Sequence, residues 1–416
     1  MKEAIHTRCC IAGGGPAGLM LGFLLARGGV DVVVLEKHKD FLRDFRGDTI
    51  HPSTLDLIHE LGILDEFLKR PHEQLTAISA RVGQQAVTLG DFTHLPTHCK
   101  FMALMPQWDF LNFIVDQARG YSNFRLIMEA EATDLIEENG VVVGLRAKTK
   151  QGEMDVRADL TVGADGRHSI VRQRAKMDVR DMGAPMDVMW MRLSRRESDP
   201  AQTFGHAEPG NMLVLINRES YWQAAFVIPK GAAEEVRQRG LPAFQREIAE
   251  MEPFLRDRVQ ELHDWNQVSL LTVKVDRLKK WSRPGLICIG DAAHAMSPIG
   301  GVGINLAIQD AVATANILSP KLRAGTLSPE DLQAVQKRRN FPTVATQRLQ
   351  LAIQNRIIRR VLAGTGPLSL PWPLKLLQWF PYLRRFPARI VGVGFRPEHI
   401  APFLAKRAPS EGTRVA

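Results

Sequence analysis

The chain has 416 residues, of which 45% are hydrophobic and 24% are charged, a composition typical of a soluble globular protein with a large core. It has no apolar run of the roughly 18 residues that a membrane span requires, and Glu3 and Arg8 interrupt its apolar start. These features exclude a membrane-spanning helix and a signal peptide, so we expect a cytoplasmic protein without stable membrane insertion.

The formal net charge of +9 is unevenly distributed. Residues 321–416 hold 17 Lys and Arg against 4 Asp and Glu, so the basic excess belongs to the C-terminal part of the chain. No recognised nucleic-acid-binding module accompanies this charge, and we expect no nucleic-acid partner.

The four cysteines show neither a C-x-x-C motif nor the spacing of metal ligands. We therefore expect no dithiol redox centre and no metal. Three of them, Cys9, Cys10 and Cys288, fall in predicted strands and are interpreted as core residues.

The N-terminal stretch predicts a dinucleotide-binding βαβ unit. An apolar strand leads into Gly13, Gly15 and Gly18, which match G-x-G-x-x-G, and an apolar helix follows. A second apolar run ends in Glu36, where a carboxylate can accept the hydroxyls of an adenosine ribose. Glycine-rich turns also occur simply to reverse the chain, but here the strand, the helix and the acid all agree with dinucleotide binding.

The rest of the chain alternates between two kinds of segment. Residues 76–92 and 187–228 have the alternating pattern of antiparallel strands, and a single charged helix is expected at about 232–250. Strand-turn-helix patterns recur, and long helices are expected after Gly303 and over residues 330–363. Further strands are expected at residues 126–135, 140–148 and Leu270–Val275, and turns are expected at Gly163–Arg172 and Gly290–His294.

Three motifs in this order resemble the FAD-dependent aromatic hydroxylases, the single-component flavoprotein monooxygenases related to p-hydroxybenzoate hydroxylase. They are Gly13–Gly18 with Glu36, Gly163–Arg172, and Gly290–His294 followed by the glycines before Asn305. The resemblance implies an α/β fold. A discontinuous Rossmann-like FAD-binding domain (residues 1–75, 100–180 and 270–330) would interleave with an antiparallel-sheet substrate domain (76–99 and 181–269), followed by a helical, proline-broken basic C-terminal segment (331–416).

The resemblance also implies roles for individual residues. Glu36, beside Lys37, would hold the adenosine ribose, and Gly13, Gly15, Ala17 and Gly18 would line the pyrophosphate. Arg46 would contact the pyrophosphate and ribityl region, although it could instead pair with Asp48. Gln107 would approach the flavin side chain, and Asp291 would accept a ribityl hydroxyl. Asp165, Gly166 and Arg172 match the motif near both FAD and the nicotinamide cofactor, and Gly301, Gly303, Ile304 and Asn305 would meet the pyrimidine edge of the flavin.

The helix expected after Gly303 supports the last assignment on physical grounds, because its N-terminal amides favour negative charge at the flavin N1–C2=O locus. The alternative is that Gly300–Gly303 only begins a helix and that Asp291 only caps one. His51 and His294 are interpreted as partners in local hydrogen bonds, so no catalytic side chain is named.

Pro298 and Ile299 would line the substrate side of the flavin, opposite a sheet face. Candidates on that face are Trp190, Phe204, Met212 and Trp222, although such residues at alternating positions are more often core.

The resemblance implies that non-covalent FAD is reduced by NADPH or NADH, reacts with O₂ and hydroxylates an aromatic or other electron-rich small molecule through a flavin hydroperoxide. No second G-x-G-x-x-G is present, so the nicotinamide would bind transiently. Two alternatives remain: a flavin-dependent reductase of isoprenoid double bonds, and a catalytically idle FAD-binding protein that shields an intermediate. The oligomeric state stays open.

The basic tail combines its charge with leucines and aromatics between Leu368 and Leu383. It could form a surface for anionic lipid, but six prolines between 367 and 397 prevent a continuous amphipathic helix. We therefore expect these apolar residues to pack within the molecule.

Overall fold

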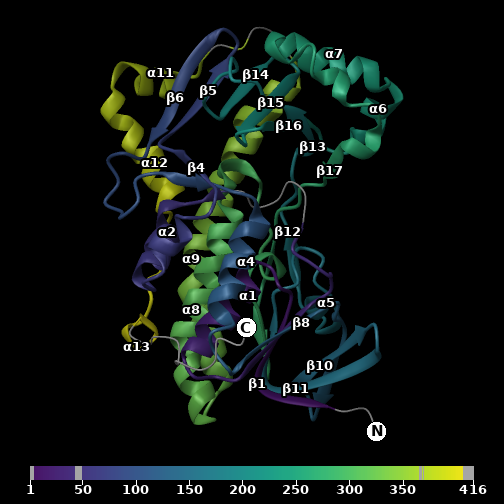
Figure 1. The fold of residues 1–416 in the computed structure, drawn as a ribbon, viewed down its shortest axis with the longest axis vertical. Helices are drawn as coiled ribbons and strands as arrows, with labels where there is room; N and C mark the ends of the chain where they lie inside the picture. The colour runs from purple at the N-terminus through teal and green to yellow at the C-terminus, as the bar shows by residue number, and fades with distance from the viewer. Residues whose placement is uncertain (1–3, 43–48, 365–367, 369, 406–416) are drawn as a thin grey trace.

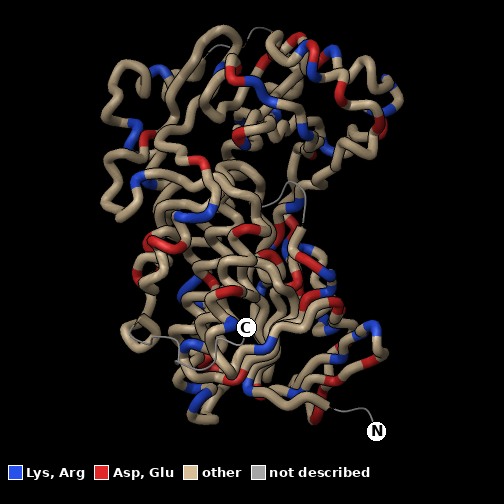
Figure 2. The backbone as a smooth tube through the Cα atoms, viewed as in Figure 1, with Lys and Arg blue, Asp and Glu red and all other residues tan. Residues whose placement is uncertain are grey.

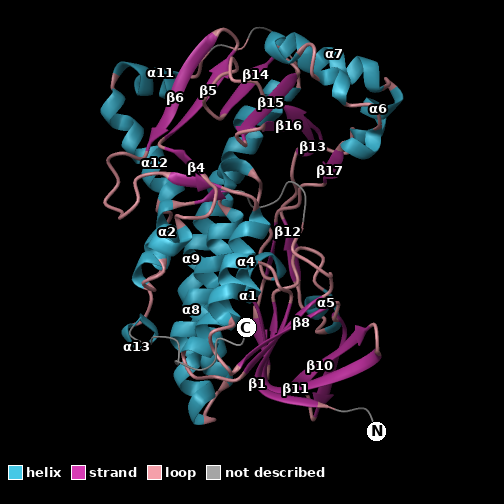
Figure 3. Ribbon diagram, viewed as in Figure 1, coloured by secondary structure: helices cyan, strands magenta, loops and turns pink. Residues whose placement is uncertain are grey.

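The computed structural model describes residues 4–42, 49–364, 368 and 370–405. Within them, two large sheets lie at opposite ends of an elongated molecule, and long helices run between them (Figures 1 and 3). This arrangement confirms the predicted fold class, an α/β domain with a largely parallel sheet, interleaved with an antiparallel-sheet domain and followed by helices.

The first sheet is built on five parallel strands in the order β20-β11-β1-β2-β8, and the remaining three pair antiparallel at its sides. Its strands are β1 (Ile5–Ala12), β2 (Val32–Glu36), β8 (Phe124–Met128), β9 (Glu131–Glu138), β10 (Val141–Thr149), β11 (Gly152–Gly163), β19 (Ser282–Arg283) and β20 (Leu286–Cys288).

Successive residues of β1 face opposite sides of this sheet. Cys9 and Ile11 pack toward α1 (Pro16–Arg27), α4 (Gln107–Ala118) and α8 (Gly303–Ala324). Cys10 and Ala12 pack toward β10 and Trp281 on the other face. Because both faces are covered, the strand is apolar throughout, and Cys9, Cys10 and Cys288 are fully buried core residues as predicted.

The second sheet has the order β17-β13-β16-β15-β14-β5-β6 and is antiparallel except where β5 runs parallel to β14. Its strands are β5 (Ala77–Val82), β6 (Gln85–Asp91), β13 (Met186–Ser194), β14 (Phe204–Glu208), β15 (Asn211–Asn217), β16 (Tyr221–Pro229) and β17 (Ser269–Leu271). The strand expected at Leu270–Val275 is shorter, and it pairs with β13 rather than joining the first sheet.

The single helix expected at 232–250 is two helices, α6 (Ala233–Gln238) and α7 (Leu241–Met251), which cover the outer face of the second sheet. Gly240 separates them at a φ of 85°, a left-handed conformation that interrupts a right-handed helix and that glycine adopts readily.

Small elements connect the two sheets. β3 (Thr49–Ile50), β4 (Glu73–Leu75) and β7 (Met102–Leu104) form a three-stranded sheet, and β12 (Val179–Asp181) pairs with β18 (Asp276–Leu278). The short helices are α2 (Pro52–Glu60), α3 (Leu64–Phe67) and α5 (Ile170–Arg174).

The C-terminal helices connect the two ends of the molecule. α9 (Pro329–Ile353) begins beside the first sheet and continues through a π-helical turn, Gln354–Ile358, into α10 (Arg359–Leu362), which packs on β15 and β16. α11 (Trp372–Trp379), a 3₁₀ turn at Pro381–Arg384 and α12 (Arg385–Gly392) pack along β6, and α13 (Pro402–Ala405) follows near the described end (Figure 1). Among the described residues, no helix combines the length and apolar character needed to cross a bilayer.

Candidate active site

The glycine turn after β1 fits a dinucleotide phosphate. Gly13 has a φ of 105°, and a Cβ on it would lie 2.4 Å from the Ala164 carbonyl oxygen. A Cβ on Gly18 would lie 1.9 Å from the Gly13 carbonyl oxygen. By contrast, a Cβ on Gly15 would meet no atom within 4 Å. The turn is thus held by Gly13 and Gly18, while Gly15 borders open space at the start of α1, where helix amides favour an anion.

Glu36 ends β2 beside this turn and is buried. Its Oε2 accepts the backbone N–H of Gly14 at 2.9 Å, and its Oε1 accepts the N–H of His38 at 3.0 Å. Ala17 is buried in the first turn of α1, and Lys37 is exposed next to Glu36. The predicted contact of Arg46 lies outside the described residues. The glycines and Glu36 thus lie together at the start of α1, in the order strand, glycine turn, helix and acid that the sequence predicts.

Asp165 follows β11 and lies against the same turn. Its Oδ2 accepts the backbone N–H of Val171 at 3.1 Å, whereas its buried Oδ1 has no hydrogen-bond partner among the described residues. Burial raises the pKa of the Asp165 carboxyl above its usual range. A buried oxygen without a partner is a site for a ligand hydroxyl or water, which fits a cofactor at this position. Gly166 follows at a φ of 83°.

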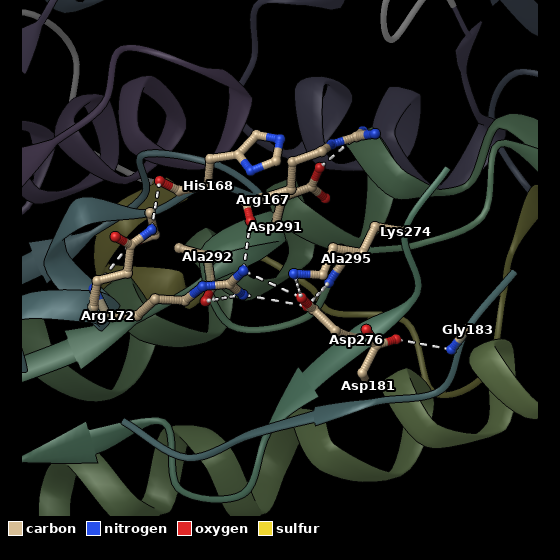
Figure 4. A network of polar contacts seen from close by, with 12 residues as sticks. Arg167, His168, Arg172, Asp181, Gly183, Lys274, Asp276, Asp291, Ala292 and Ala295 are labelled. Atoms are coloured by element: carbon tan, nitrogen blue, oxygen red, sulfur yellow. Dashed lines mark hydrogen bonds and ion pairs between the residues drawn. The ribbon is translucent and has the colours of Figure 1, made fainter. Parts of the chain in front are cut away.

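The side chain of Arg172 does not face the expected cofactor position. Its guanidinium points into the protein instead (Figure 4). It forms a bidentate ion pair with fully buried Asp276, with Nη1–Oδ1 and Nη2–Oδ2 distances of 3.2 and 3.1 Å. It also donates to the carbonyl oxygens of Arg167 and Ala292. With its guanidinium committed to these partners, Arg172 joins two of the sequence motifs to β18, and we do not propose it as a nicotinamide contact.

Asp291 lies in the 3₁₀ turn Gly290–Ala292, and Arg167 Nη2 lies 3.4 Å from its Oδ2 (Figure 4). Its side chain is 30% exposed, so its carboxylate is accessible to a cofactor hydroxyl. His294, in contrast, is buried, with its Nε2 2.5 Å from Asp310 Oδ2. Arg339 donates to the other oxygen of Asp310, and the contacts with His294 and Arg339 hold the pKa of Asp310 below its usual range although burial opposes the shift. His294 is therefore part of a buried support behind Asp291.

The turn before α8 is fixed by its backbone. Gly300 and Gly301 have φ values of 75° and 63°, and a Cβ on Gly301 would lie 2.2 Å from Thr49 Oγ1. Asn305 was expected to meet the flavin, but its side chain is used within the protein. Its Oδ1 accepts from His51 N and Thr54 Oγ1, and its Nδ2 donates to the carbonyls of Thr49 and Gly301.

The other residues assigned to the flavin lie at helix starts. Gly303 begins α8, with buried Ile304 after it, and half-buried Gln107 begins α4. The N-terminal amides of α8 suit the negative edge of a flavin, whereas the Asn305 amide positions this turn instead.

The substrate candidates divide between the two faces of the second sheet. Trp190 and Met212 pack in one apolar cluster with Ile299, and half-buried Pro298 precedes Ile299. Phe204 and Trp222 pack on the opposite face, under α6 and α7, where Trp222 is fully buried and donates to Asp199. The alternation of side chains along each strand separates the two pairs. Phe204 and Trp222 are core residues and are not substrate contacts.

A row of glutamines on α9 and the π-helical turn that continues it was not recognised from the sequence. Gln350 accepts from Ser297 N and donates to the carbonyls of Ser297 and Ile299, both at 2.9 Å. Gln347 donates to the carbonyls of Asp276 and Ala295, and Gln354 donates to Ser297 Oγ at 2.6 Å. Their spacing of three and four residues puts them on one helix face. This spacing is visible in the sequence, but polar residues on exposed helices have the same spacing, so it did not identify the row.

Comparisons with known proteins agree with this geometry. A family model described as an FAD binding domain matches residues 6–349. The 6-methylpretetramide 4-monooxygenase of Streptomyces rimosus is 32% identical over 373 residues, which cover 88% of this chain and 87% of that protein.

Solved structures share the fold. The anhydrotetracycline hydroxylase of Streptomyces rimosus aligns with a TM-score of 0.73 at 22% identity, covering 93% of this chain and 76% of that one. The p-nitrophenol 4-monooxygenase of Pseudomonas putida aligns with a TM-score of 0.71 at 21% identity, covering 92% and 99%.

Proposed function

The chain belongs to the FAD-binding-domain family and is an FAD-dependent aromatic monooxygenase, and from this premise we propose that it hydroxylates a polycyclic aromatic polyketide, using NADPH or NADH and O₂. The observation that carries the substrate class is the 32% identity, over nearly the whole of both chains, to a monooxygenase named for 6-methylpretetramide. The reductant would be NADPH or NADH of the cytoplasm.

Bound FAD would supply the redox chemistry of the reaction with NADPH or NADH and O₂. The chain binds and orients this cofactor. Gly13, Gly15 and Gly18 shape the pyrophosphate turn, Glu36 holds the adenosine ribose, and Asp165 and Asp291 accept cofactor hydroxyls. The first amides of α8 stabilise negative charge on the flavin edge.

The chain also excludes water from the reacting atoms. Ile299 lies in one cluster with Trp190 and Met212. An apolar surface therefore lies between the second sheet and the turn before α8, Ile299–Gly301, which we call the flavin turn. A site without water favours transfer of oxygen to the substrate over its release as hydrogen peroxide. This surface also suits a planar aromatic substrate, because a ring can stack or pack edge to face on Trp190.

The proposal is tested by measuring nicotinamide oxidation by the purified, FAD-loaded enzyme with phenols, quinolones and polycyclic polyketide-like phenols. We expect the polycyclic compounds to accelerate oxidation at least about tenfold, with hydroxylated product. Acceleration only by single-ring phenols would contradict the proposed substrate class.

A matched pair of variants locates the substrate. Trp190→Ala should raise KM for the polycyclic substrate about tenfold, because it removes an aromatic contact and its buried area. Trp265→Ala removes a partly buried tryptophan from the opposite side of the sheet and should leave KM unchanged. Equal effects of the two substitutions would argue against a substrate site at Trp190.

A further inference from the structure

The C-terminal segment presents large apolar side chains to solvent, contrary to the expected packing inside the molecule. Six of them are between 37% and 73% exposed. They come from α11, α12 and the residues between them, and we call them the aromatic face: Trp372, Trp379, Phe380, Tyr382, Phe386 and Ile390. Solvent-exposed apolar groups gathered on neighbouring elements mark a surface that binds another apolar body.

This exposure does not come from a loosely attached segment. Leu377 and Ala388 are buried, and Ala388 packs so closely on β6 that a Cβ on Gly90 would lie 3.3 Å from its backbone nitrogen. Gln378 donates to the Ala86 carbonyl at 3.0 Å. The segment is thus fixed to the second sheet by one side and presents the aromatic face on the other.

The charged side chains that residues 371–397 contribute around the aromatic face are all basic. Lys375, Arg385 and Arg389 are exposed there, and residues 371–397 contain no Asp or Glu (Figure 2). On α12, Arg385, Phe386, Arg389 and Ile390 share one helix face, while Ala388 and Gly392 face the protein. Asp91 of β6 lies near Arg384, which is not part of the exposed set.

We propose that the aromatic face docks on the surface of an anionic lipid bilayer, without spanning it. Tryptophan, tyrosine and phenylalanine beside arginine and lysine are the side chains that favour the boundary between headgroups and acyl chains. The uniform positive charge complements anionic lipid. The same charge opposes pairing of two copies through this face, because like charges would meet across the symmetry axis.

The proposed docking surface continues to the candidate active site, and in this respect it goes beyond the proposed function. His51 Nδ1 lies 2.7 Å from the carbonyl oxygen of Val391 in α12. Val391 Cγ1 lies 4.0 Å from the position that a Cβ would take on Gly300, in the turn before α8. A lipophilic substrate dissolved in the bilayer would therefore meet the enzyme beside its flavin turn.

The test is co-sedimentation of the full-length, FAD-loaded protein with vesicles of phosphatidylcholine alone and of phosphatidylcholine with phosphatidylglycerol, at physiological salt. We expect binding to the anionic vesicles only. Arg385→Glu with Arg389→Glu should weaken this binding at least about tenfold, and Trp379→Ala with Phe386→Ala should also weaken it.

The matched control is Arg237→Glu with Arg256→Glu, which changes the net charge equally at exposed positions in and beside α6 and α7, on the other side of the second sheet. This control should bind as the wild type does. Thermal melting of each variant shows that it is folded, independently of activity.

The proposal would be overturned by a lack of binding to anionic vesicles or by equal weakening in the control pair. It would also be overturned by binding to polyglutamate in place of vesicles, which would indicate an acidic protein partner. Concentration-dependent dimers that the Trp379→Ala and Phe386→Ala changes abolish, without vesicle binding, would assign the face to self-association. None of these results would affect the proposed monooxygenase activity, which is measured separately in solution.

Discussion

Gly15 and Gly18 lie three residues apart in one turn, yet their surroundings differ. A Cβ on Gly18 would collide with the Gly13 carbonyl oxygen at 1.9 Å, while a Cβ on Gly15 would reach only open space. Gly18→Ala should therefore lower the melting temperature of the apoprotein. Gly15→Ala should leave the apoprotein melting temperature near the wild-type value but weaken FAD binding about tenfold or more, because a methyl group would occupy the pyrophosphate position. FAD titration and melting of both variants measure the two effects. Unchanged FAD affinity in Gly15→Ala would show that the pyrophosphate does not bind beside Gly15.

His51 gives the fold a pH dependence. It is 1% exposed, and burial, opposed by contacts with the carbonyls of Val391 and Gly300, lowers its pKa from 6.5 to about 4. Between pH 4 and pH 6.5 the His51 imidazole is protonated in the unfolded state but not in the folded state. The contribution of neutral His51 to the free energy of unfolding is therefore full above about pH 6.5 and is lost as the pH falls toward 4. This loss lowers the free energy of unfolding by up to about 3 kcal/mol.

The measurement is the free energy of unfolding of the wild type and of His51→Gln from pH 7 to pH 4. The stability of the wild type should fall more steeply than that of the variant. His6→Gln, at an exposed position, is the control and should follow the wild type. Parallel curves for the wild type and His51→Gln would show that His51 is not held neutral.

At the scale of elements, α9 connects the flavin turn to the first sheet. Gln350 binds the backbone on both sides of Pro298, so Gln350→Ala should loosen Ile299 and the turn before α8. We expect FAD affinity to stay within a few-fold, the yield of hydroxylated product per nicotinamide to fall severalfold, and hydrogen peroxide to rise, because water reaches the flavin. Gln333→Ala, exposed on the same helix, is the control. A Gln350→Ala enzyme that couples oxidation to product as well as the wild type would exclude this positioning role.

The elements that the sequence predicted well are those with strong local signals. Strand β1, the glycine turn, Glu36 and the start of α8 follow from short-range patterns whose geometry leaves few alternatives. The divided helix at Gly240 and the short β17 were missed because their limits depend on a positive φ and on which sheet accepts the strand. Phe204 and Trp222 were misassigned because alternation shows that two faces exist but not which face the cofactor occupies. Arg172 and Asn305 were assigned to the cofactor by motif, but partners distant in sequence, Asp276 and His51, use their side chains instead.

At the scale of the whole molecule, two sheets of different kinds are joined by helices that contact both. The parallel sheet carries the phosphate turn and the buried acids, the antiparallel sheet carries Trp190 and Met212, and Ile299 lies between them. A cofactor held by the first sheet and an aromatic substrate on the second would meet at that junction. Under the proposed function, sequence-distant segments would thus form one oxygenating site, and for this reason the sequence alone could not identify the substrate.

The most direct test of this account is the reaction of the purified, FAD-loaded enzyme with a reduced nicotinamide, a polycyclic phenolic substrate and ¹⁸O₂, followed by mass spectrometry of the product. The account predicts a hydroxylated product that carries one ¹⁸O atom from O₂. A product that is reduced at a double bond and contains no ¹⁸O, or nicotinamide oxidation that the substrate never accelerates, would contradict it.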